Sequence, residues 1–157
     1  MILEAYLNEG LFGFNRKQEL QMSDELLDEI FKFVKSILLK YNKNSSCFNK
    51  IKSNLKELKR RLIEEDNYTE KQIKSEFGNV INNPPKFKPI VWKESKTELI
   101  ISYLGGDYNQ YINECYIDTL TIICKEINDT DFFKQNSLHI SYGDGDEGCL
   151  YINKIGW

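Results

Sequence analysis

Two successive stretches of regularly spaced apolar residues, together spanning Ser23 to Glu65, constrain the fold of this chain more than any other feature. In the first stretch the spacing of three or four residues predicts an amphipathic α-helix. Ser23 can accept a hydrogen bond from the first free backbone amides, and Asp24 and Glu25 follow where the helix dipole favours negative charge. The apolar positions of this helix are Leu27, Ile30, Phe31, Val34, Leu38 and Tyr41.

The second stretch, from about Ser46 to Glu65, has a narrower apolar seam that predicts a helix packed against one neighbour. Its members are Phe48, Ile51, Leu55, Leu58 and Leu62. A third, short helix is expected to begin at Thr69, because Thr69 and Gln72 have the spacing of a capping box. It should end near Gly78, since the prolines at 84 and 85 cannot continue a helix.

Beyond the prolines the residue types become those of strands. Residues 87–92 and 97–104 predict one β-hairpin, and residues 138–142 and 149–155 predict another. A short hairpin is also expected within Ile2–Leu20. Between the two later hairpins, the apolar spacing of Tyr108–Asn128 favours a helix with a capping pair at Asp107 and Gln110. Because its residue types favour strand, the choice between helix and strand stays open there.

These segments predict an α+β fold in one domain, residues 1–157, with a helical half at about 1–83 and a strand-rich half at about 84–157. Three N-terminal helices and one later helix should pack on an antiparallel sheet of about four to six strands. The sequence has no leader pattern, no membrane-spanning run and no C-x-x-C pair among its four cysteines. We therefore expect a cytoplasmic protein with reduced thiols.

Charge is distributed unevenly along the chain. The net charge is −3, yet Lys32–Leu62 contains ten Lys or Arg residues and one acid, Glu57. The segment Tyr103–Trp157 has nine acids, three lysines and six of the nine tyrosines. Tyrosine offers large contact area at low entropic cost, and carboxylates steer the approach of a basic partner. The C-terminal third therefore has the composition of a surface that binds a basic protein.

The loop Gly143–Gly148 matches the spacing G-x-G-x-x-G, but a strand follows it instead of a helix, and its carboxylates would repel a dinucleotide. Asp144 and Asp146 have the spacing of the first two calcium ligands, yet the later ligands are missing, so cation binding stays open. We predict no cofactor and no metal site. A glycine-rich hairpin turn is the simplest interpretation.

The leading hypothesis is a non-catalytic protein-binding module, most concretely a bacterial immunity or inhibitor protein that neutralises a basic toxin such as a nuclease. The candidate partner-binding residues are Asp107, Tyr108, Tyr111, Tyr142, Asp144, Asp146, Glu147 and Tyr151. One alternative is a small enzyme or ligand-binding domain with a site near His139 and the Asp144–Glu147 loop. A third is a nucleic-acid binder that uses Lys50–Arg61, which the acidic net charge disfavours.

Overall fold

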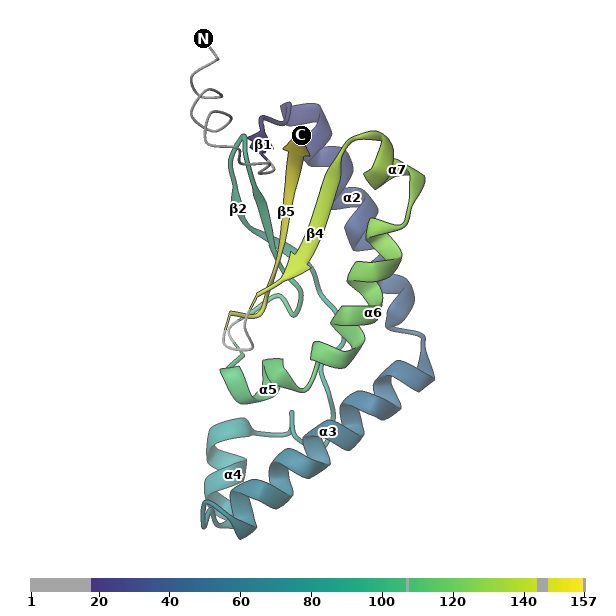
Figure 1. Ribbon diagram of the computed structural model, residues 1–157. Coiled ribbons are helices and arrows are strands. Elements are labelled where there is room, and N and C mark those ends of the chain that lie inside the picture. The colour runs from purple at the N-terminus through teal and green to yellow at the C-terminus, as the bar shows by residue number, and fades with distance from the viewer. Residues whose placement is uncertain (1–17, 107, 144–146, 157) are drawn as a thin grey trace, which may run out of the picture.

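The computed structural model describes residues 18–106, 108–143 and 147–156 and has an α+β fold (Figure 1). Its helices are α2 (Asp24–Tyr41), α3 (Ser45–Glu64), α4 (Glu70–Phe77), α5 (Gln110–Glu114), α6 (Ile117–Asn128) and α7 (Asp131–Gln135). Its strands are β1 (Gln18–Leu20), β2 (Ile90–Glu94), β3 (Leu99–Ser102), β4 (Leu138–Tyr142) and β5 (Cys149–Gly156). The predicted fold class is confirmed: N-terminal helices pack with an antiparallel sheet of the expected size.

The sheet is organised around β5, which pairs with three other strands. β4 pairs with one side of it, while β3 pairs with residues 149–152 and β1 with residues 154–156 on the other side. β2 pairs with β3 and forms an outer strand. All four pairings are antiparallel. The second predicted hairpin is therefore the pair β4–β5, and the first is β2–β3.

The helices cover one face and one end of this sheet. α6 and α7 pack against β4, α2 lies beside α6, and α3 runs obliquely past the end of the sheet with α4 against it (Figure 1). Leu99, Ile101, Leu150 and Ile152 are fully buried on the helix-covered face. Together with the buried residues of α2, α3 and α6 they form one apolar cluster that includes both halves of the chain.

Helices α2 and α4 begin with the predicted caps. Ser23 Oγ accepts from the amide of Leu26 at 3.1 Å, and Thr69 and Gln72 form the reciprocal capping box. α3 starts one residue earlier than predicted, because the side chain of Asn44 caps it by accepting from the amide of Cys47. These starts are recovered from sequence because each depends on residues three positions apart.

The segment Tyr108–Asn128 is helical, but it forms two helices where the sequence predicted one. α5 is capped by Asn109, two residues after the predicted cap, and it ends at Glu114 with Cys115 as its C-cap. The carbonyl of Cys115 accepts from Asn54 of α3 at 3.0 Å, and the Tyr116 hydroxyl donates to the carbonyl of Pro85 at 2.6 Å. Both partners are distant in sequence, so local spacing could not reveal the break.

Three further features differ from the sequence expectations. α7 was not predicted, although Thr130 caps it through the amide of Phe133. β2 begins at Ile90, and the backbone of Phe87, where the strand was predicted to start, is instead bonded at both N–H and C=O by the side chain of Asn42. The hairpin expected within residues 2–20 lies outside the described residues except for β1.

Candidate functional site

A concavity of ≈ 530 Å³ lies on the face of the sheet that the helices leave uncovered. Successive side chains of a strand point to opposite faces, so Ile100 and Tyr151, which are cross-strand partners, lie away from the buried Leu99 and Ile101. The loop after β3 and the β4–β5 hairpin complete the wall. The described lining residues are Trp92, Lys93, Ile100, Ser102, Gly106, Tyr108, Glu147, Cys149 and Tyr151.

Three aromatic side chains, Trp92, Tyr108 and Tyr151, line this concavity. Trp92 has 63% of its surface exposed, the largest value among the exposed large apolar side chains of the described residues. The pairing of β2 with β3 shifts register between Val91 and Lys93, which places Trp92 in a β-bulge. Bulges re-aim side chains at sheet edges. The result is a large aromatic surface at the rim of a hollow.

The polar side of the concavity is a pair formed by Glu147 and Tyr151. Partial burial and a hydrogen bond to the Glu147 carboxylate raise the pKa of the Tyr151 phenol, so the phenol stays protonated and donates. Gly143 makes room for this pair: a Cβ there would lie 2.5 Å from Glu147 Oε1 and 2.7 Å from Tyr151 Cε2. Gly148 has a left-handed backbone, with φ +65°, which glycine adopts without strain.

Only part of the predicted partner-binding set comes together. Tyr108, Glu147 and Tyr151 line the concavity. Tyr142 instead lies against α6, with its hydroxyl 2.9 Å from Thr121 Oγ1. Tyr111 packs edge-on against the ring of Phe77 of α4, at 6.3 Å between centroids. Of the other predicted members, Asp107, Asp144 and Asp146 lie outside the described residues.

Sequence reasoning missed Trp92, the largest exposed side chain of this site. Ile90 and Val91 beside it are 42% and 40% exposed, so β2 presents three consecutive apolar residues to solvent. The signal was present, because consecutive apolar residues without alternation do not suit a strand with one buried and one wet face. The same pattern is expected for a strand buried on both faces and for an exposed edge strand, and only the tertiary structure distinguishes the two.

Of the residues considered for catalysis or metal binding, Asp144 and Asp146 lie outside the described residues, and the structure places the others as follows. His139 is exposed on β4, paired in register with Asn153, and does not line the concavity. All four cysteines are buried with free thiols, and burial raises the pKa of Cys115 to about 11 and that of Cys124 to about 12, so both are weak nucleophiles at neutral pH. Among the described residues, no three His, Cys, Asp or Glu side chains group as metal ligands.

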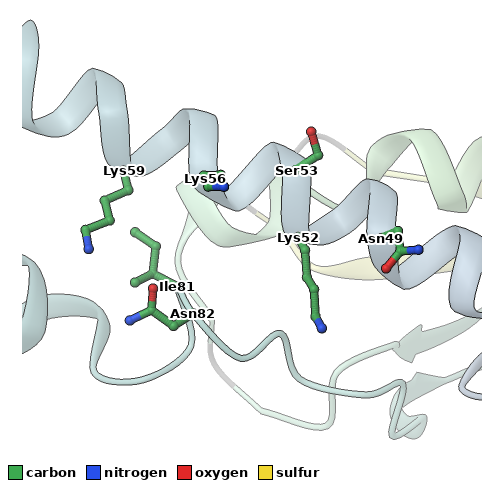
Figure 2. Close-up of a pocket in the computed structure, with 7 residues that line it drawn as sticks. All are labelled: Asn49, Lys52, Ser53, Lys56, Lys59, Ile81 and Asn82. Carbon is green, nitrogen blue, oxygen red and sulfur yellow. The ribbon is translucent and has the colours of Figure 1, made fainter.

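The basic residues of the second helix divide between two surfaces. Arg60 is neutralised by Glu57, Glu64 and Glu65, with N···O distances of 2.6, 3.1 and 3.2 Å. Lys50 faces Asp118 of α6 at 3.7 Å. The remaining lysines of α3 that face away from the core, Lys52, Lys56 and Lys59, line a separate hollow (Figure 2).

No protein-family model, curated protein sequence or solved structure matches this chain. In the part of the chain that the structure describes, no helix combines the length and apolar character needed to span a membrane.

Proposed function

We propose that this protein is a protein-binding module that receives a partner in the concavity of the uncovered sheet face, as an immunity or inhibitor protein receives a basic toxin. The observation that carries the proposal is the combination of Trp92, Tyr108 and Tyr151 with the Glu147 carboxylate around one hollow. Tryptophan and tyrosine are the residues most often found at the energetic centre of protein interfaces.

The chemistry of the hollow suits a lysine or arginine side chain of the partner. The Glu147 carboxylate supplies a counter-ion, and the aromatic rings supply faces that attract a cation. Lys93 also lines the hollow, so the described lining holds one charge of each sign. The sequence adds Asp144 and Asp146 to the same hairpin loop as Glu147, which favours a basic partner over an acidic one.

The test is co-purification of the protein with the product of the adjacent gene, followed by titration calorimetry. Glu147→Gln and Trp92→Ala should each weaken the complex by about tenfold or more, because one removes the counter-ion of the hollow and the other removes its largest aromatic surface. Glu29→Gln makes the same charge change on α2, and Ile122→Ala removes an exposed apolar side chain from α6.

These two control variants should bind as the unaltered protein does. The absence of any complex would argue against the proposal. So would a complex in which the control variants weaken binding as much as Glu147→Gln and Trp92→Ala do, because the partner would then contact a different surface.

A further inference from the structure

A second hollow follows the exposed face of α3, away from the sheet. It has a volume of ≈ 570 Å³ and lies between α3 and the chain at Ile81 and Asn82 (Figure 2). Lys52, Lys56 and Lys59 line it from the helix. Steps of four and three residues place these lysines on one helix face. In Figure 2, Lys52 and Lys59 point from α3 toward the side on which Ile81 and Asn82 lie.

This hollow is the middle section of a longer groove. A hollow of ≈ 290 Å³ near the start of α3 shares Lys52 with it, and a hollow of ≈ 440 Å³ near the end of α3 shares Lys59. Each end section contributes two more lysines. They are Lys43 and Lys86 at the first end and Lys71 and Lys74 at the second. Seven lysines from three parts of the chain therefore line one path.

The positive charge of this path is largely uncompensated. Glu70, which lies 3.6 Å from Lys59 Nζ, is the one carboxylate among the described lining residues. Within the described residues the other six lysines make no ion pair. Arg60, which follows Lys59 on α3, is by contrast paired with three carboxylates. The groove thus gathers lysines that have almost no counter-ions, whereas the positive charge of Arg60 on the same helix is neutralised.

We infer that this groove binds a single-stranded nucleic acid along its phosphate backbone. Lysine ammonium groups in a row are the usual partners of successive phosphates. Asn49 and Asn82 add amide groups that can bond sugars or base edges, and Phe48, partly buried at one end, offers a ring for stacking. α3 has 20 residues and is roughly 30 Å long, so the path can contact several consecutive nucleotides.

The shape of the groove favours a strand over a membrane surface. A concave path along α3 can follow one extended polyanion, whereas a bilayer surface is flat and does not match a hollow. The net charge of −3 belongs to the whole chain, whereas seven lysines and one carboxylate line the groove, and charges beyond about 8–10 Å are largely screened at physiological salt. The groove shares no lining residue with the concavity of the proposed protein-binding surface.

The test is fluorescence anisotropy with a labelled mixed-sequence RNA of about 20 nucleotides, a length that exceeds one binding site. The unaltered protein should bind with an affinity that falls steeply as salt rises. The triple variant Lys52→Gln, Lys56→Gln, Lys59→Gln should lose about three phosphate contacts. The slope of log affinity against log salt should then decrease in magnitude by about 2, at roughly 0.7 per contact on a single strand.

The matched control is Lys35→Gln, Lys96→Gln, Lys134→Gln, which removes the same charge from α2, the β2–β3 turn and α7. It should keep the slope of the unaltered protein, and thermal denaturation should show that both triple variants are folded. Equal loss of binding in the two variants would overturn the inference. Failure to bind RNA at low salt would overturn it too, as would binding confined to duplex DNA or to vesicles of anionic lipid.

Discussion

Gly143 shows how a single absent side chain shapes the concavity. The space that a Cβ would need there is filled by the Glu147 carboxylate and the ring of Tyr151. The sequence suggested that the glycines of this loop serve a turn, and Gly148 does so with its left-handed backbone. At Gly143, glycine is needed because neighbouring side chains occupy the position of a Cβ atom. No sequence pattern in the loop could indicate this.

The variant Gly143→Ala should therefore destabilise the protein by about 1 kcal/mol, because the added methyl group would force the Glu147 carboxylate and the Tyr151 ring to move. Chemical denaturation measures the change. Gly106→Ala is the matched control, since a Cβ at that position meets nothing within 4 Å. A Gly143→Ala protein as stable as the Gly106→Ala protein would contradict the described packing.

At the scale of elements, the two outer strands of the sheet differ in how their edges are treated. The side chain of Asn128 bonds Ile140 of β4 twice, donating to its carbonyl and accepting from its amide, both at 2.9 Å. A further strand that paired with β4 would need these two backbone groups of Ile140 for its own hydrogen bonds. No described strand or side chain makes the equivalent pair of bonds along the outer edge of β2. Within the described residues, α6 thus occupies the ladder position at Ile140 on one edge, and nothing equivalent lies along β2.

Replacing Asn128 tests these bonds to β4. Asn128→Ala removes two neutral hydrogen bonds to partly buried backbone groups and should cost about 2 kcal/mol of stability, measured by chemical denaturation. Asp129→Ala is the neighbouring control. It removes only an exposed contact with Lys125 and should change stability by less than about 0.5 kcal/mol. Equal effects of the two substitutions would mean that Asn128 does not stabilise β4.

The elements also show which parts of the fold the sequence could reveal. α2, α3 and α4 were predicted nearly to the residue, because their apolar spacing and caps are set by residues three or four positions apart. The break between α5 and α6 depends on Asn54 and Pro85, which lie 61 and 31 residues from their partners. Three members of the concavity were predicted from composition. Trp92 was not, because exposure at a sheet edge is a property of the tertiary structure.

At the scale of the whole molecule, buried phenols link stability to alkaline pH. Burial raises the pKa of Tyr103 and Tyr116 above the ordinary value, and burial with a bond to Glu126 raises that of Tyr41 to about 12. A raised folded pKa means that the stabilising contribution is fully present below the unfolded value of about 10 and is lost as pH rises beyond it. The protein should therefore tolerate neutral pH and unfold progressively above about pH 10.

Tyr116→Phe isolates one of these groups. At neutral pH the variant should be less stable, because the carbonyl of Pro85 loses its donor. Above about pH 10 its stability should fall less steeply than that of the unaltered protein, since one buried phenol no longer has to ionise on unfolding. Denaturation midpoints across the alkaline range measure both effects. Parallel pH profiles for the two proteins would exclude Tyr116 as a source of the alkaline sensitivity.

The unequal edges of the sheet also set a limit on self-association. Two copies that joined through their β2 strands would form one continuous sheet, and Asn128 would then stand at both of its ends. Strand addition at either end would then have to displace the Asn128 side chain from Ile140, which disfavours growth beyond two chains through these described strands. The exposed apolar residues of β2 thus carry a lower risk of fibril growth than an equally apolar strand in a sheet with two open edges.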